Sequence, residues 1–183
     1  MKPGDLLLVR GTALLSQEIM KATGGSFSHV GIVVCSMEPM NKEDGIIIEA
    51  LDRVKTRPFH LSTLQASYWE IWSNKTLADD QRWAIVNEAC DYSAMDYAWG
   101  RIGEQALDDL FHTTWFTKLP SLNGKPICSY LAAVAYKSIG ETLGTDFETI
   151  TPSDAHGTGI AEFVAKNPKY ELVLKKTNFE AGK

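Results

Sequence analysis

Short apolar segments separated by polar turns dominate the first part of the chain. They are rich in β-branched and aromatic residues, as strands are. The pattern predicts strands over 6–9, 29–36, 46–51, 54–59 and 68–73. Two of them, HVGIVVCS and IIIEAL, are almost continuously apolar, so we expect both faces of their sheet to be covered. The polar stretch Asn41–Gly45 between these two is predicted to be a turn.

The apolar spacing changes to a helical period later in the chain. We predict helices over 13–22 (capped by Thr12), 78–92, 97–110 and 127–139, a loop over 119–126 and a last strand over 170–175. Trp83 lies on an apolar helical stripe and is expected in the core. These elements indicate an α+β fold. We expect a single domain over 1–183, with a small antiparallel sheet or half-barrel packed against helices.

Charge is distributed in a way that excludes one class of partner. The 183 residues carry a net charge of -5. All of that excess lies in residues 61–120, with four basic and nine acidic residues, while the flanking thirds are each balanced at seven and seven. Because nucleic-acid binding needs clustered Lys and Arg, we expect no nucleic-acid partner. The predicted helices also lack the basic face of a membrane-surface protein.

The cysteines and the first residues bear on the compartment. Three widely spaced cysteines (35, 90 and 128) form neither an even disulfide set nor a close zinc pair. We therefore expect free thiols and no metal. The apolar run Leu6–Val9 is too short for a signal peptide or a membrane span. As written, the sequence predicts a cytoplasmic protein without integral membrane contact.

Cys128 is the candidate nucleophile. It follows the loop Asn123–Pro126 and opens a helix of small and apolar residues. The positive end of a helix dipole stabilises a thiolate there. The alternative is a buried thiol that only fills space, an interpretation that fits Cys35 and Cys90 better.

A base and its orienting group can be placed by strand pairing. If 29–36 and 45–51 form an antiparallel hairpin, the start of the first strand lies opposite the end of the second, which brings His29 close to Glu49. A carboxylate inside IIIEAL would be buried and would need a partner. The spacing therefore supports a Cys–His–Glu site. The alternative is that both residues face water, and Asp52 could replace Glu49. The other histidines, at 60, 112 and 156, are expected at the surface.

Four segments in this order resemble a known family: SFSHVGIVV, IIIEA, PICSYLAAVAY and TPSD. Together with PGDLLLVRG they resemble the circularly permuted branch of the NlpC-type cysteine peptidases, the YiiX-like proteins. The resemblance implies a papain-like fold in which the base and its acidic partner precede the nucleophile. Matched residue by residue, it implies His29 as base, Glu49 as its orienting residue and Cys128 as nucleophile.

Two positions depart from that family. Tyr130 stands where an acidic residue is common, and Met95-Asp96-Tyr97 replaces a Gly-x-x-Tyr-Asp stretch. Tyr97 is similar to a tyrosine that polarises the substrate carbonyl, so it is a candidate oxyanion donor, in competition with Tyr92. The backbone N–H of Cys128 is a second donor.

Tryptophans offer candidate substrate contacts. Trp69 and Trp72 lie on opposite faces of one predicted strand, so at least one is a candidate for binding a sugar, peptide or acyl chain. The alternative is ordinary packing.

Taken together, these features predict a thiol hydrolase that needs no cofactor. The resemblance favours an amide substrate in a cell-wall peptide or a related small peptide, reached by a route other than an export signal. Alternatives are a lipid ester or amide acyl hydrolase or acyltransferase, and an inert binding or scaffold module. The sequence does not define the oligomeric state.

Overall fold

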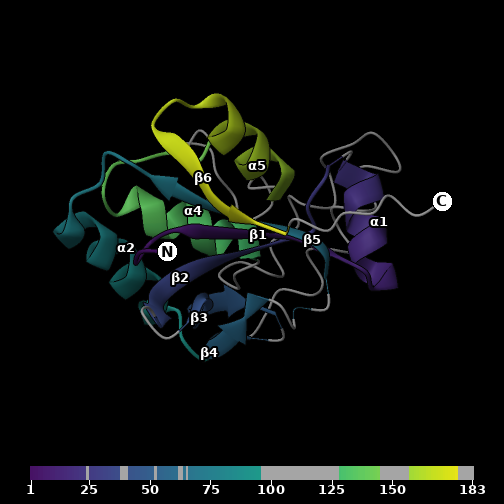
Figure 1. Cartoon of the computed structure of the whole chain (residues 1–183), viewed down its shortest axis with the longest axis horizontal. Helices are drawn as coiled ribbons and strands as arrows, with labels where there is room; N and C mark the ends of the chain where they lie inside the picture. Colours follow the sequence, from purple (N-terminus) through teal and green to yellow (C-terminus); the bar gives the residue numbers. More distant parts are fainter. Residues whose placement is uncertain are drawn as a thin grey trace, which may run out of the picture.

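A six-stranded antiparallel sheet forms the centre of the computed structural model (Figure 1). The structure describes residues 1–23, 25–37, 41–51, 53–61, 64, 66–95, 128–144 and 157–176. The strands are β1 (Leu6–Gly11), β2 (His29–Met37), β3 (Asn41–Ala50), β4 (Val54–His60), β5 (Ala66–Asn74) and β6 (Tyr170–Lys175). They lie in the order β4-β3-β2-β1-β5-β6, so the first strand of the chain is an inner strand.

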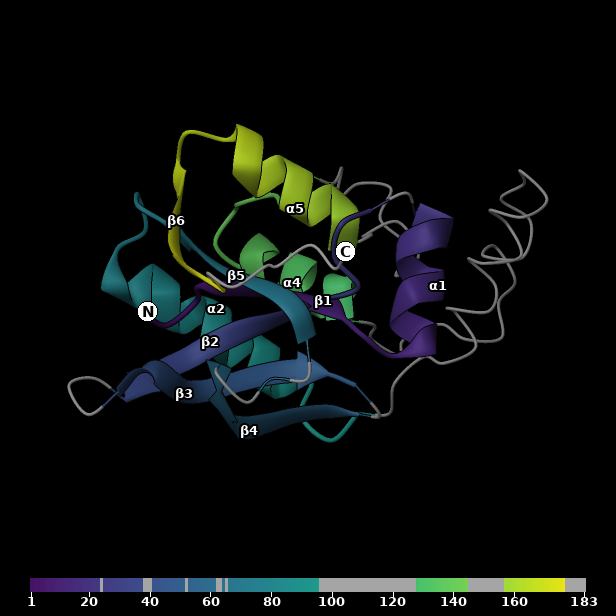
Figure 2. The same cartoon turned by 45° about the vertical axis from the view of Figure 1, so that its right-hand side comes forward.

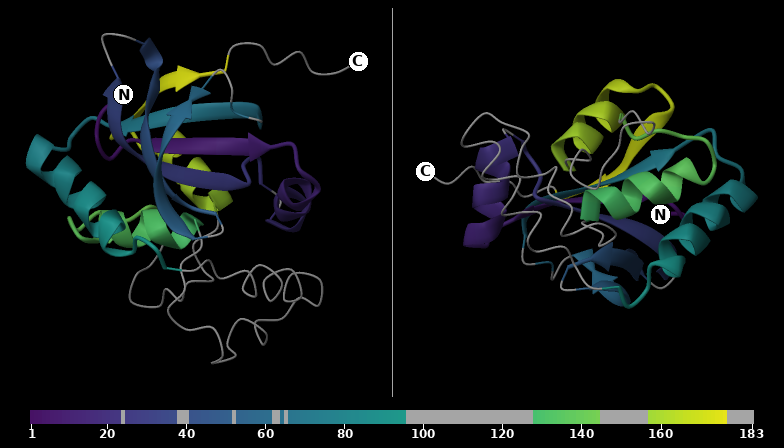
Figure 3. Two further views of the ribbon diagram at one scale, coloured as in Figure 1. Left: turned by 90° about the horizontal axis from the view of Figure 1, so that it is seen from below. Right: turned by 180° about the vertical axis from the view of Figure 1, so that it is seen from behind.

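Four helices belong to the described part of the chain: α1 (Leu14–Thr23), α2 (Asp79–Asp91), α4 (Cys128–Lys137) and α5 (Gly157–Lys166). Seen from behind the sheet, α2 and α4 lie side by side, and α5 lies next to β6 (Figure 3). Helix α1 stands apart, beyond the end of β1 (Figure 2). The architecture is α+β, as predicted. None of the helices in the described ranges is long and apolar enough to cross a bilayer.

The alternation of side chains along each strand divides the core into two clusters. The helix-side cluster joins α2, α4 and α5 to the sheet and includes Leu6, Leu8, Val30, Ile32, Ile48, Ile85, Leu131 and Ile160. The opposite cluster lies on the other face and contains Leu7, Val9, Val33, Ile47, Phe59, Leu61, Ala66, Trp69 and Ile71. Both faces of β2 and β3 are thus covered, which confirms the expectation from their continuous apolar runs.

Two sequence expectations about the fold are corrected, and one helix was not predicted. Asn41–Gly45 is part of β3 rather than a turn, because Asp44 and Gly45 pair with His60 and Phe59 of β4. Helix α5 was not predicted from the sequence, since it opens with two glycines. Trp83 is 47% exposed rather than in the core, because α2 packs through its buried residues Arg82, Ile85, Val86 and Ala89. The predicted helix 97–110 and loop 119–126 lie outside the described residues.

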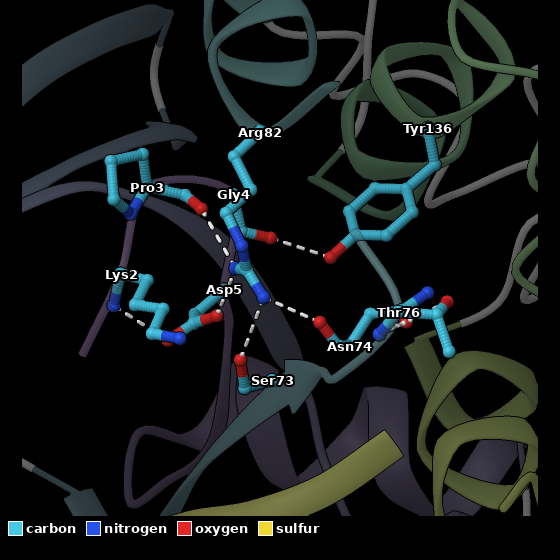
Figure 4. A network of polar contacts seen from close by, with 9 residues as sticks. All are labelled: Lys2, Pro3, Gly4, Asp5, Ser73, Asn74, Thr76, Arg82 and Tyr136. Carbon is cyan, nitrogen blue, oxygen red and sulfur yellow. Dashed lines mark hydrogen bonds and ion pairs between the residues drawn. The ribbon is translucent and has the colours of Figure 1, made fainter. Parts of the chain in front are cut away.

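A buried ion pair connects the start of the chain to α2 and the end of β5 (Figure 4). Arg82 and Asp5 are 3% and 0% exposed, and Arg82 Nη1 donates to Asp5 Oδ1 at 2.9 Å. The same guanidinium also donates to Ser73 Oγ and to the backbone carbonyls of Pro3 and Asn74. Tyr136 of α4 adds a hydrogen bond to the carbonyl of Gly4. This network holds the chain before β1 against two helices.

Candidate active site

His29 and Glu49 meet across the β2–β3 ladder. Glu49 pairs with Gly31 in the register, and His29 lies two residues before Gly31 on the same face of β2. Since Gly31 places no side chain between them, the imidazole reaches the carboxylate. His29 Nε2 donates to Glu49 Oε2 at 2.7 Å, and the Glu49 side chain is 2% exposed. The structure therefore brings together the two residues that the hairpin argument had paired.

Cys128 completes the arrangement from the helix layer. It is the first residue of α4, which contacts both β2 and β3, and it is 8% exposed. Its thiol hydrogen-bonds the His29 imidazole. Because Nε2 is engaged with Glu49, Nδ1 is the ring nitrogen available to the thiol. A cysteine at the start of a helix also benefits from the positive end of the dipole. Thiol, imidazole and carboxylate thus form one hydrogen-bonded series.

The electrostatics of His29 favour its protonated form. Burial alone would lower the pKa of the imidazole, but Cys128 and then Glu49 outweigh it and raise that pKa to about 10. An imidazole with this pKa is an imidazolium at neutral pH, which is the state that pairs with a thiolate. The site is therefore suited to hold a Cys–His ion pair.

Glu49 has a second partner that sequence analysis missed. Arg57 Nε of β4 forms an ion pair with Glu49 Oε1. Burial would raise the pKa of Glu49, but His29 and Arg57 outweigh it and lower that pKa below its usual value. The signal available in the sequence was the β3–β4 hairpin, which places Arg57 diagonally across from Glu49 on the same face.

The other candidate site residues differ in where the structure places them. Tyr92 packs edge-on against Tyr130 with ring centroids 6.4 Å apart, so it serves as a packing aromatic. Trp69 is only 4% exposed and belongs to the opposite cluster, which leaves little surface for a substrate. Trp72 is partly buried and donates from Nε1 to Glu70. Tyr97 and Asp52 lie outside the described residues.

No disulfide joins the three cysteines, all of which the structure describes. Cys35 is partly buried, Cys128 is buried and Cys90 is exposed, so the expectation that Cys90 fills space in the core was wrong. The pKa of the Cys90 thiol is raised by partial burial and by the neighbouring Asp91. The chain therefore contains an exposed thiol in an unfavourable electrostatic setting, against which Cys128 can be compared.

The described part of the chain shows no trio of His, Cys, Asp or Glu side chains placed to hold a metal ion. His29 Nε2 and Glu49 Oε2 are hydrogen-bonded to each other. A metal ion at this place would have to displace the proton of His29 Nε2 and take over the Glu49 oxygen that accepts it.

The antiparallel sheet carries α2, α4 and α5 on one face, and Cys128 at the start of α4 contacts His29 of the His29–Glu49 pair on β2 and β3. The chain is similar to the crystal structure of the metalloprotein yiiX, DUF1105, from Escherichia coli O157:H7, with a TM-score of 0.60. The match covers 96% of this chain and 97% of that chain at 17% sequence identity. The sequence itself matches no family model and no curated protein. At this identity the likeness shows a YiiX-like fold.

Proposed function

We propose that this protein is a thiol hydrolase with Cys128 as nucleophile, His29 as base and Glu49 as the residue that orients His29. The observation that carries the proposal is the hydrogen-bonded series from the Cys128 thiol through His29 to a Glu49 carboxylate that is 2% exposed. Nucleophile, base and orienting group in mutual contact are the signature of an activated nucleophile. The YiiX-like fold supports it, and we propose that this fold is a circularly permuted papain-like one.

The chemistry follows from these positions. The Cys128 thiolate attacks an amide or ester carbonyl, a C–S bond forms, and the carbonyl oxygen takes the negative charge. We expect the backbone N–H at the start of α4 to stabilise that oxyanion. As the tetrahedral intermediate collapses, the C–N or C–O bond breaks and His29 gives its proton to the leaving group. A water molecule, deprotonated by His29, then hydrolyses the thioester and regenerates the thiol.

The substrate we favour is an amide in a cell-wall peptide or a related small peptide, as the sequence resemblance implies. The same series of groups would serve a lipid ester. The structural neighbour is described as a metalloprotein. Because the groups of this site bind one another and the described residues contain no metal-ligand trio, we derive no step through a metal.

One observation favours a second candidate, an inert binding module. Cys128 is only 8% exposed, as expected for a space-filling thiol. Against this, Glu49 does not face solvent and is bonded to His29. The two functions differ in whether His29 activates the thiol.

The deciding measurement is the alkylation rate of each cysteine against pH, mapped by mass spectrometry. We expect the midpoint of the Cys128 curve to lie about 2 pH units or more below that of Cys90, because an adjacent imidazolium and a helix N-terminus stabilise the thiolate. In His29→Ala we expect this advantage to disappear. Comparing midpoints rather than rates removes the effect of burial on access.

His60→Ala is the matched control, because His60 pairs with Asp44 on the β3–β4 ladder and should leave the Cys128 curve unchanged. Coincident midpoints for Cys128 and Cys90 in the wild-type protein would end the hydrolase proposal in favour of the binding module.

A further inference from the structure

The ion pair between Arg57 and Glu49 assigns a role to a residue outside the Cys–His–Glu series. We infer that Arg57 is a positioning residue of the active site, which holds the Glu49 carboxylate ionised and directed at His29. The inference rests on the proposed function, because it concerns the reactivity of the same thiol. Arg57 does not touch the reacting atoms and acts only through Glu49.

The geometry divides the two oxygens of Glu49 between two partners. Oε2 accepts from His29 Nε2 at 2.7 Å, and Oε1 accepts from Arg57 Nε. A carboxylate held at both oxygens cannot rotate about its last bond without losing one contact. Arg57 lies on β4 and His29 on β2, so Glu49 on β3 forms hydrogen bonds with both neighbouring strands. The orientation of the imidazole toward Cys128 thus depends on β4 as well as β2.

The burial of Glu49 explains why one partner is not enough. A carboxylate with 2% exposure has lost its hydration, and unless it is compensated it takes up a proton instead. A protonated Glu49 would no longer stabilise the imidazolium of His29. Among the described residues, the charged or titratable groups around Glu49 are His29, Arg57, Lys55 directly opposite on β4, and Cys128 beyond His29. The pKa of Glu49 is lowered by His29 and Arg57 against the effect of burial.

Arg57 also reaches the surface, which makes its role accessible to a chemical test. Its side chain is 36% exposed and borders a hollow of about 650 Å³. The hollow is lined by Met37, Asp44, Arg57, Pro58, Phe59, His60 and Leu64. Small cations can therefore enter from solvent at the position of the guanidinium, while Glu49 itself stays buried.

The first test is the pH dependence of Cys128 alkylation in Arg57→Met. Loss of the cation should raise the pKa of Glu49, so the midpoint of the Cys128 curve should move up by about 1 pH unit. That shift makes the rate below the midpoint about 10-fold lower. Arg57→Lys keeps the charge and should recover most of the shift. Lys166→Met removes the cation of an exposed ion pair on α5, away from the site, and should leave the midpoint where it is.

The second test is chemical rescue. In Arg57→Ala, low millimolar guanidinium should return the Cys128 midpoint toward the wild-type value, because the ion fits the space left beside Glu49 and can donate two hydrogen bonds to it. Sodium at the same ionic strength should not. The wild-type protein and Lys166→Met should show no response to guanidinium.

The outcomes separate the inference from the proposed function. If the wild-type Cys128 midpoint is not below that of Cys90, the proposed hydrolase and this inference are both overturned. If the wild-type midpoint is low and requires His29, but Arg57→Met leaves it unchanged, the inference alone is overturned. A lower thermal stability of Arg57→Met with an unshifted midpoint, and no guanidinium rescue, would show a merely structural role.

Discussion

Replacing Cys128 with Ala is expected to abolish acyl-enzyme formation while leaving the fold intact. In the proposed mechanism the Cys128 thiol forms the covalent bond to the substrate, and removing such a nucleophile costs about 10⁴-fold or more in turnover. The lost sulfur leaves only a small space beside the first turn of α4. The measurement is the initial burst of nitrophenolate from 4-nitrophenyl acetate, with the acetyl group located by mass spectrometry and the fold checked by circular dichroism.

Cys90→Ala is the matched control for this experiment, because Cys90 is the exposed thiol and lies on α2. It should keep the full burst, and the acetyl group should be found on Cys128. An unchanged burst in Cys128→Ala, or acetylation of Cys90 alone, would contradict the thiol mechanism.

The second large effect concerns stability. Arg82→Met should lower the free energy of unfolding by about 3–5 kcal/mol, because it leaves the Asp5 carboxylate buried and without its cation. Asp5 is 0% exposed, so water cannot replace the guanidinium. For a chain of this size the expected fall in Tm is about 10 °C. Urea unfolding followed by circular dichroism gives the free energy, and calorimetry gives the Tm.

Two further variants serve as controls for the Arg82→Met prediction. Lys166→Met breaks the exposed ion pair of Lys166 with Glu162 on α5, whose N–O distance is 3.4 Å, and should change stability by about 0.5 kcal/mol or less. The double variant Asp5→Leu with Arg82→Met should recover part of the loss, since neither charge is then buried alone. An Arg82→Met protein as stable as the wild type would mean that the network of Figure 4 does not hold the N-terminal segment.

The sequence defined the strands well where the hydrophobic pattern is strong. β1, β2 and β6 lie within two residues of their predicted bounds. It defined them poorly where pairing decides the structure. Asn41–Gly45 has the composition of a turn, yet the ladder to β4 extends β3 through it. Pairing with a strand that is distant in the sequence can override a local preference for a turn. The local composition of residues 41–45 does not show which strand they will pair with.

Helices show the same limit. In α5, Ile160 and Val164 are both buried and one turn apart, so an apolar signal was present. The two glycines at its start concealed it, because glycine disfavours helices. For Trp83, apolar spacing alone could not tell which side of α2 would face the sheet, because buried Arg82 replaces an apolar residue on the packed side.

Strand alternation and the order of the strands along the chain were enough to predict one part of the site. Pairing of two apolar strands was enough to place His29 beside Glu49, and the structure confirms that contact. Arg57 was not found, because its relation to Glu49 depends on the β3–β4 register and on a diagonal side-chain contact. Trp69 is buried because other side chains of the opposite cluster cover its face of the sheet. The alternation of residues along the strand does not show that this face is covered.

The chain order of the site has a consequence for synthesis on the ribosome. Cys128 follows Glu49 by 79 residues, so at about 5–20 residues per second it is made roughly 4–16 s later. Through that interval β1 to β4 can pair, but the face that α4 will cover still exposes Leu8, Ile32 and Ile48. A nascent chain at this stage is a natural client for chaperones. The thiol also meets its base only when α4 docks on the sheet, so unfinished chains should carry no activated cysteine.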